Sequence, residues 1–190
     1  PEKIAKLHST SIDAGSDIFL TNSFGSNALR LKLHNFGNRA FDLSKISAEI
    51  AREVADTYDR EVFVAGSIGP TGEIMQPIGH LSHELAVEVF HEQALGLKEG
   101  GADLLWLETI SAPEEFKAAA EAFAYLEIPW VGTMSFDTAG RTMMGTSPAD
   151  MVDIISSIPN KPIAFGANCG TGAPDLLRTI QDFAKVSPKS

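Results

Sequence analysis

The fold of this chain follows from one run of residues, Ala164-Phe165-Gly166-Ala167-Asn168-Cys169-Gly170. It predicts a short apolar strand from Ile163 to Ala167 that brings Asn168 and Cys169 to its carboxyl end. Parallel α/β folds place their chemistry at the carboxyl ends of their strands, so a thiol at this point is a candidate functional group. Position alone favours the other interpretation, because a free cysteine is usually a small buried hydrophobe.

Four further apolar runs precede this strand, and each predicts a strand of its own. They are Asp17–Thr21, Val62–Gly66, Asp103–Leu107 and Pro129–Met134. Between the strands, apolar residues recur at helical spacing, and Ser82, Ser111 and Ser147 are candidate caps for three of the helices. Helices are expected over 1–14, about 44–58 and 82–100, then after each of the last two serines and around Leu176. This strict alternation predicts βαβ units and a parallel sheet.

Two architectures fit this alternation. A doubly wound sheet normally has a G-x-G-x-x-G turn after its first strand, whereas Gly66, Gly69 and Gly72 follow the second strand at a different spacing. A (β/α)₈ barrel of the TIM type needs about 250 residues, so five strands would be a barrel cut short at one or both ends. Polar loops after every strand suit a barrel mouth. We therefore expect an incomplete α/β barrel, with residues 1–190 forming a single domain.

Composition limits the classes of partner and the compartment. Lys and Arg number 15 and Asp and Glu number 25, so the formal net charge is −10, which argues against nucleic acid and anionic membrane surfaces. No stretch approaches the roughly 18 apolar residues of a membrane span, so we expect no membrane partner. A single cysteine excludes an internal disulfide and favours the cytoplasm. A homo-oligomer is compatible with this composition.

Two residues at predicted strand ends are candidates for chemistry. Glu108 ends an apolar strand, where a carboxylate either binds an ammonium group, acts as a base, or pairs with a nearby lysine or backbone amide. Cys169 could be a nucleophile or one zinc ligand, but spacing identifies no histidine partner and the chain has no second cysteine. The residues alone therefore indicate a barrel-like domain with a thiol and a carboxylate at its mouth.

Two other patterns have simpler explanations. The glycines between Gly66 and Gly72 could cradle a phosphate, but no Lys-Ser or Lys-Thr follows them, so tight turns explain them better. His80 and His83 resemble a pair of metal ligands, yet they lie around a predicted helix start without a further cysteine or histidine pair nearby. A solvent-exposed helix start explains them better.

Taken together, the loops resemble those of the zinc-dependent homocysteine S-methyltransferases. This family includes betaine–homocysteine methyltransferase and the homocysteine-binding module of cobalamin-dependent methionine synthase. Each matching segment lies at a strand entry or exit, and the segments occur in the family's order through nearly the whole chain. They are Asp13–Asp17 with Thr21–Gly25, Ala65–Gly72, Leu107–Thr109, Thr133–Phe136 and Gly166–Gly170.

The resemblance implies a (β/α)₈ barrel whose mouth holds zinc on three cysteine thiolates. Homocysteine adds its own sulfur to the metal, is deprotonated there, and attacks a methyl group of a small donor. By position, Cys169 matches the first zinc ligand and Glu108 matches the acid that holds the homocysteine amino group, which makes both candidate catalytic residues. The residues that match substrate-binding positions are Thr21, Asn22, Ser23, Phe24, Glu108 and Asn168.

The chain departs from the family pattern at both ends. The family's Gly-Gly-Cys-Cys pair and its first strand have no counterpart here, so the resemblance implies strands two to six of the barrel of a longer protein. One thiolate cannot form the zinc site, so we expect the segment alone to be inactive, with unpaired sheet edges near Asp17 and Ile163. A non-catalytic binding module and a pterin-binding methyltransferase on the same barrel are the alternatives. The methyl donor stays open among betaine, S-methylmethionine, S-adenosylmethionine and methyl-cobalamin.

Overall fold

Five parallel strands form one curved sheet in the computed structural model, which describes residues 1–186. The strands are β1 Ile18–Leu20, β2 Phe63–Ile68, β3 Leu104–Ile110, β4 Trp130–Met134 and β5 Ala164–Ala167. Their order in the sheet is the order of the chain, without the reversal that defines a doubly wound fold. The predicted strands and their parallel pairing are confirmed, and the sequential order is that of a section of a (β/α)₈ barrel.

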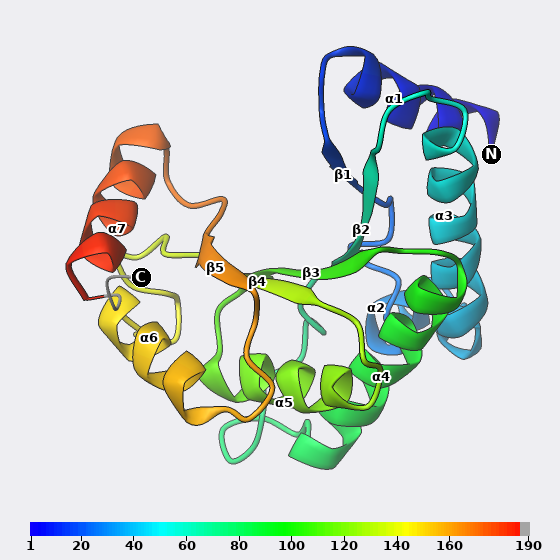
Figure 1. Cartoon of the computed structure of the whole chain (residues 1–190). Helices are drawn as coiled ribbons and strands as arrows, with labels where there is room; N and C mark the ends of the chain where they lie inside the picture. The colour runs from blue at the N-terminus through cyan, green and yellow to red at the C-terminus, as the bar shows by residue number, and fades with distance from the viewer. Residues whose placement is uncertain (187–190) are drawn as a thin grey trace.

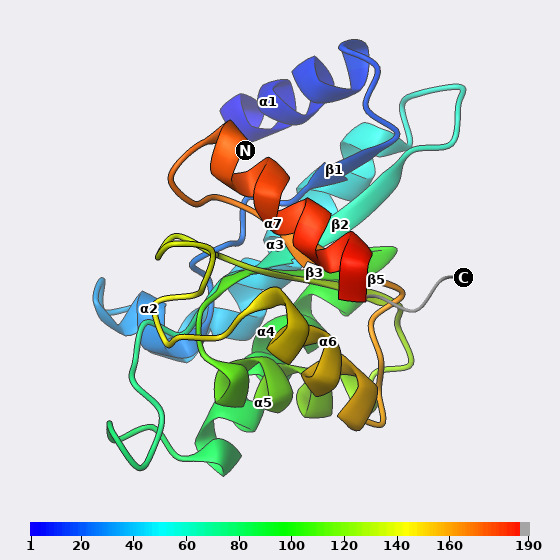
Figure 2. The same cartoon turned by 90° about the vertical axis from the view of Figure 1, so that its left-hand side faces the viewer.

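Helices cover the convex side of this sheet, as the arc of ribbons in Figure 1 shows. They are α1 Glu2–Asp13, α2 Ala28–Lys32, α3 Ala40–Ala55, α4 His83–Glu99, α5 Pro113–Ala124, α6 Pro148–Ser157 and α7 Ala173–Val186, with the short 3₁₀ helix η1 Gly37–Arg39. Seen from the side in Figure 2, α6 and α7 lie in front of the strands, beside β5. No helix within 1–186 combines the length and apolar character needed to cross a membrane.

The main core lies between the sheet and helices α4, α5 and α6. Trp130 of β4 is its largest fully buried side chain and packs against Phe116 and Phe123 of α5 at centroid distances of 5.5 and 5.4 Å. Gly132, two residues along β4, permits this packing, because a Cβ there would lie 2.6 Å from the Phe116 ring. The alternating apolar residues of β4 therefore attach α5 to the sheet and fix the position of the loops that leave both elements.

The concave face of the sheet is the inner face of the barrel section. Ala65, Leu104 and Val131 form a small buried cluster there, with Trp106 packed against it. Towards the β1 edge, apolar side chains become accessible, and Ile18 is 46% exposed. Within the described residues the sheet ends at β1 and β5, which confirms the two expected edges.

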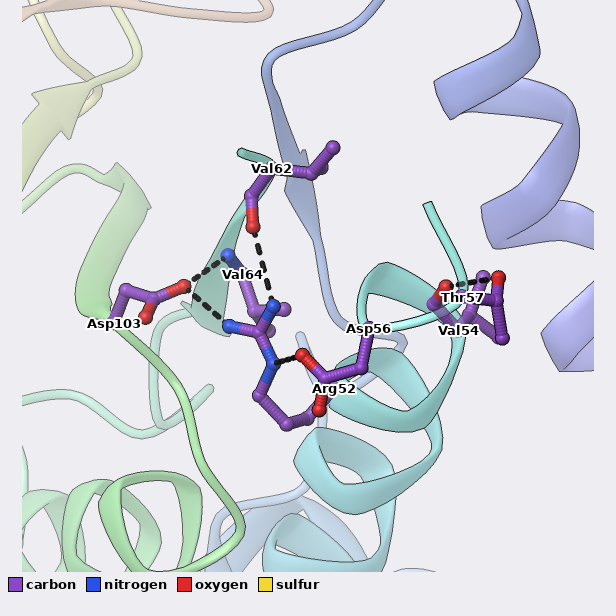
Figure 3. A network of polar contacts seen from close by, with 7 residues as sticks. All are labelled: Arg52, Val54, Asp56, Thr57, Val62, Val64 and Asp103. Atoms are coloured by element: carbon purple, nitrogen blue, oxygen red, sulfur yellow. Dashed lines mark hydrogen bonds and ion pairs between the residues drawn. The ribbon is translucent and has the colours of Figure 1, made fainter. Parts of the chain in front are cut away.

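The amino ends of β2 and β3 are tied to α3 by one arginine (Figure 3). Arg52 donates to Asp103 Oδ2 at 2.9 Å, to the Val62 carbonyl at 3.3 Å and to Asp56 Oδ1 at 2.9 Å. Asp103 Oδ2 also accepts the backbone N–H of Val64 at 2.6 Å. This network lies at the end of the strands opposite to the candidate residues, so it stabilises the barrel section without entering the mouth.

Two of the three predicted serine caps are confirmed. Ser82 accepts the N–H of Leu85 at the start of α4, and Ser147 forms a capping box at the start of α6. The prediction for Ser111 is wrong, because the N-cap of α5 is Ala112 and no side chain caps it. Pro113 takes the first helical position, where its fixed φ and missing N–H are favourable, and this moves the helix start beyond the reach of the serine.

Candidate active site

The carboxyl ends of the strands bring polar residues from four of them to one edge of the sheet. Ser67 comes from β2, Glu108 and Thr109 from β3, Thr133 from β4, and Asn168 directly follows β5. Parallel strands end at the same edge, so the barrel geometry alone gathers these residues. The edge corresponds to the mouth expected from the sequence.

Asn168 joins three of these strand ends through its side-chain amide. Its Oδ1 accepts the backbone N–H of Thr109 at 3.0 Å and the hydroxyl of Thr133 at 2.9 Å. Its Nδ2 donates to Thr109 Oγ1 at 2.7 Å. We call Asn168, Thr109 and Thr133 the amide clasp, because one planar group holds β3, β4 and β5 together at the mouth.

Cys169 follows the amide clasp and is exposed to solvent. Its backbone has a left-handed φ of +57°, and its Sγ lies 3.6 Å from Asn168 Nδ2 and 3.8 Å from Thr109 Oγ1. The interpretation of Cys169 as a buried hydrophobe is therefore wrong. Within residues 1–186, no histidine hydrogen-bonds this thiol, so the structure gives it no base of the kind that activates a cysteine nucleophile.

Glu108 points towards β2 from a bulge in β3. The register with β4 shifts between Leu107 and Ile110, and bulges of this kind commonly re-aim side chains next to active sites. Glu108 Oε1 accepts the hydroxyl of Ser67 at 2.6 Å. Among the described residues, neither lysine nor arginine forms an ion pair with Glu108, so its half-buried charge is not compensated by a side chain. The carboxylate is free to receive a cationic group from a ligand.

The four candidates in the loop after β1 divide into two pairs. Thr21 and Ser23 are buried, with their hydroxyls 2.5 Å apart. They also bond to the backbone N–H and carbonyl of Ser67, at 3.0 and 2.7 Å. Asn22 and Phe24 are exposed. Thr21 and Ser23 therefore shape the loop, whereas Asn22 and Phe24 present side chains at its surface.

Gln93 of α4 hydrogen-bonds to the loop after β1 and to β2. We did not identify it from the sequence. It is fully buried, and its Nε2 donates to the Ser23 carbonyl at 2.8 Å, to Ser26 Oγ at 3.1 Å and to the Ser67 carbonyl at 3.4 Å. The sequence does contain a signal for this role. An uncharged amide on the buried face of an amphipathic helix needs hydrogen-bond partners, and Gln93 lies one turn from Phe90 and Leu97 on that face.

The glycine-rich loop after β2 is held by a carboxylate. Thr71 donates to Glu115 Oε1 from its backbone N–H at 2.7 Å and from its hydroxyl at 2.6 Å. Glu115 is buried in the first turn of α5, and desolvation raises the pKa of its carboxyl group above the usual value. Since Glu115 already occupies the anion position at the Thr71 N–H, this geometry favours the tight-turn interpretation of the loop.

The described residues do not form a metal site by themselves. Within 1–186, no three His, Cys, Asp or Glu side chains group in a way that would hold a metal ion. His83 is the first residue of α4 and bonds through Nε2 to Glu121 at 2.8 Å, which agrees with the helix-start interpretation. Cys169 offers one soft ligand, whereas catalytic zinc takes three protein ligands. The donor set therefore does not fit a complete zinc site.

The fold and the position of its polar residues define a (β/α)-barrel protein with its candidate site at the mouth. The family described as homocysteine S-methyltransferase matches residues 1–190. The chain is 30% identical over 198 residues to a methionine synthase of Mycobacterium tuberculosis and 29% identical over 194 residues to that of Mycobacterium leprae. It superposes on the metallated form of the homocysteine methyltransferase MmuM from Escherichia coli with a TM-score of 0.85 and 24% identity.

The chain belongs to the homocysteine S-methyltransferase family, because the family match extends over all of its residues. The shares of length covered differ between the two kinds of relative. The alignment takes in 98% of this chain and 16% of the Mycobacterium tuberculosis enzyme, and 97% and 16% for that of Mycobacterium leprae. With MmuM it takes in 98% of this chain and 69% of that chain. The MmuM match therefore supports the barrel fold, of which the described sheet is a section.

Proposed function

We propose that the protein containing this chain transfers a methyl group to the sulfur of homocysteine and yields methionine. One observation supports this proposal most directly: an uncompensated carboxylate, Glu108, and an exposed thiol, Cys169, lie at one edge of the sheet with Thr109 connecting them. Homocysteine has an ammonium group that suits the carboxylate. Membership of the family and the likeness to methionine synthases support the same reaction.

We assign the side chains to the two ends of the substrate. Glu108 accepts the ammonium group, oriented by the Ser67 hydroxyl. Asn22 and Phe24 border the substrate, while Thr21 and Ser23 hold the loop in shape. Asn168 orients the strand ends on which the carboxylate and the thiol stand.

The reaction itself needs a thiolate and an activated methyl group. The homocysteine thiol loses its proton to solvent, and its sulfur forms a new bond to the methyl carbon. The bond between the methyl carbon and the donor breaks, and its electron pair stays with the donor. A small methyl donor such as betaine satisfies this balance, as would S-methylmethionine, S-adenosylmethionine or methyl-cobalamin. The chain's own contribution is to bind homocysteine and to hold its sulfur in place.

We propose zinc as the cofactor, with Cys169 as one ligand and the others supplied by residues outside this sequence. A bound zinc ion lowers the pKa of a coordinated thiol. Because the described residues offer one such ligand, we expect the segment 1–190 alone to be inactive and to be part of one larger barrel domain. With a single cysteine and no disulfide, the cytoplasm is the expected compartment.

The test is the zinc content of the full-length protein, measured beside Cys169→Ser and beside Thr171→Ser as a matched control two residues away. We expect about one zinc per chain in the wild type, retained in the control and lost in Cys169→Ser, together with methyl transfer to homocysteine. Zinc retained by Cys169→Ser would remove Cys169 from the metal site. Homocysteine bound without zinc and without methyl transfer would favour the non-catalytic binding module.

A further inference from the structure

Thr109 has a backbone conformation that its side chain disfavours. Its φ is +63°, in the left-handed region, where a β-branched residue is a genuine outlier. Such strain persists only where the surroundings hold it, and it concentrates at functional sites. Thr109 also lies within the bulge of β3, directly after Glu108. The position therefore calls for an explanation beyond strand pairing.

Hydrogen bonds within the amide clasp hold Thr109 in this conformation. One side chain, Asn168, bonds to both its backbone N–H and its hydroxyl, at 3.0 and 2.7 Å. Asn168 is in turn fixed by Thr133 at 2.9 Å. The Asn168–Thr109 pair spans 59 positions of the sequence, so the strained turn depends on the pairing of β4 with both β3 and β5 and not on local sequence.

Thr109 connects the two ends of the proposed site. Through the peptide bond it follows Glu108, whose carboxylate is aimed at Ser67 by the bulge. Through its hydroxyl it lies 3.8 Å from the Cys169 sulfur. Because Asn168 bonds to both the backbone and the side chain of Thr109, the peptide that follows Glu108 and the residue that precedes Cys169 are held in one fixed arrangement.

We propose that Thr109 is a positioning residue that sets the length of amino thiol the site accepts, and that it thereby selects homocysteine over cysteine. The inference rests on the proposed function. Cysteine is one methylene shorter, so it cannot satisfy the carboxylate and the thiol end together while their separation is fixed. A hydrophobic contact with one methylene discriminates by only about 10- to 200-fold, and a fixed spacing adds to that discrimination.

The test measures dissociation constants of L-homocysteine and L-cysteine by calorimetry on the full-length protein. Thr109→Val keeps the β-branched shape but removes the hydroxyl bond from Asn168, and we expect the preference for homocysteine to fall about tenfold. Thr109→Ser keeps the hydroxyl, and we expect it to restore the preference to within about threefold. Thr138→Val is the matched control, since its exposed hydroxyl bonds only to Asp137, at 3.2 Å, among the described residues.

Thr109→Gly keeps the test decisive if Thr109→Val does not fold. Glycine adopts a positive φ without strain, so this variant should fold and should still lose the preference. An unchanged ratio of the two dissociation constants in a folded Thr109→Val or Thr109→Gly protein would overturn the inference while leaving the proposed function in place. A wild-type protein that binds neither amino thiol would overturn both.

Discussion

The hydroxyl of Ser67 donates to Glu108 Oε1 at 2.6 Å, so the carboxylate of β3 is aimed by its neighbour strand. Ser67 is buried, and its own carbonyl accepts from Ser23 and Gln93, which fixes the backbone that carries the hydroxyl. A hydrogen bond to a charged group is stronger than one between neutral groups. Under the proposed function, Ser67 is therefore a second determinant of amino-acid binding, beside Glu108.

We expect Ser67→Ala to weaken homocysteine binding by about 10- to 150-fold, because a hydrogen bond to a charged group contributes about 1.5–3 kcal/mol. Glu108→Gln removes the charge itself and should weaken binding further. Calorimetry on the full-length protein measures both effects. Ser156→Ala is the control, since its hydroxyl bonds to the Val152 carbonyl at 2.8 Å on α6. Equal affinities in Ser67→Ala and the control would show that Glu108 needs no orientation.

The sequence predicted the strand-end positions of three candidate residues, and these positions are what the structure shows. Asn168, Cys169 and Glu108 lie at or next to strand ends, and apolar runs identify strand ends locally. Ser67, Thr109 and Gln93 were not assigned, because their roles depend on contacts made across the fold. Gln93 and Ser23 are 70 positions apart, and Ser67 and Glu108 are 41 positions apart. No local pattern contains such pairings.

We expect the hydrogen bonds from Thr71 to Glu115, and not the negative charge of Glu115, to hold the glycine-rich loop after β2. Burial raises its carboxyl pKa above 4.5, so the folded state binds the proton more readily than the unfolded state. Proton binding by Glu115 therefore stabilises the folded state. This stabilisation is fully present below about pH 4.5 and is lost as the pH rises through the folded pKa. Glu115→Gln keeps an acceptor for Thr71 without the charge, and we expect it to be at least as stable as the wild type at pH 8.

Glu115→Ala should behave differently, because Thr71 would lose the acceptor of both its hydrogen bonds. We expect a loss of about 1–3 kcal/mol in the free energy of unfolding, measured by urea denaturation. Glu114→Ala, on the exposed neighbour, is the control and should change stability by less than about 0.5 kcal/mol. A Glu115→Gln protein as unstable as Glu115→Ala would mean that the loop requires the ionised carboxylate.

His8 should give the opposite dependence on pH. It is buried on α1 against Phe19, at a centroid distance of 5.0 Å, and desolvation lowers its pKa below 6.5. The unfolded state then binds the proton more readily, so this contribution to stability is present above about pH 6.5 and is lost as the pH falls through the folded pKa. Replacing His8 with phenylalanine removes the titrating group and the Nε2 that has no partner within the described residues.

The measurement for His8→Phe is a pair of urea titrations at pH 8 and pH 5.5, with the wild type beside the variant. We expect the variant to gain stability over the wild type on going to the lower pH. Comparing the two proteins at each pH cancels the opposite contribution of Glu115. His34→Phe, at an exposed position, controls for the change of composition. A difference between wild type and variant that does not change with pH would contradict the assignment to His8.

The strands and long helices were predictable because their signals are local, and the missed elements show where such signals stop. Helix α2 has five residues, which are too few to show a repeating helical pattern of apolar residues in the sequence. The Asn27 side chain fixes its start by accepting the N–H of Arg30 at 3.0 Å. The 3₁₀ turn η1 leads directly into α3, so that helix begins at Ala40 and not near Ser44. The cap of α5 was misplaced because a proline at its first position outweighs the serine spacing.

Arg52 and Asp103 should be required for stability and not for binding, because their network lies at the amino ends of β2 and β3 (Figure 3). Asp103→Ala removes the acceptor of both the Arg52 guanidinium and the Val64 N–H, and we expect a loss of about 1–3 kcal/mol in the free energy of unfolding. The homocysteine dissociation constant of the folded variant should stay within about twofold, since sites at the mouth of a barrel are separate from its opposite face. Asp153→Ala, on the exposed face of α6, is the matched control for both measurements. A folded Asp103→Ala protein with normal stability and weakened binding would show instead that this network reaches the mouth through β3.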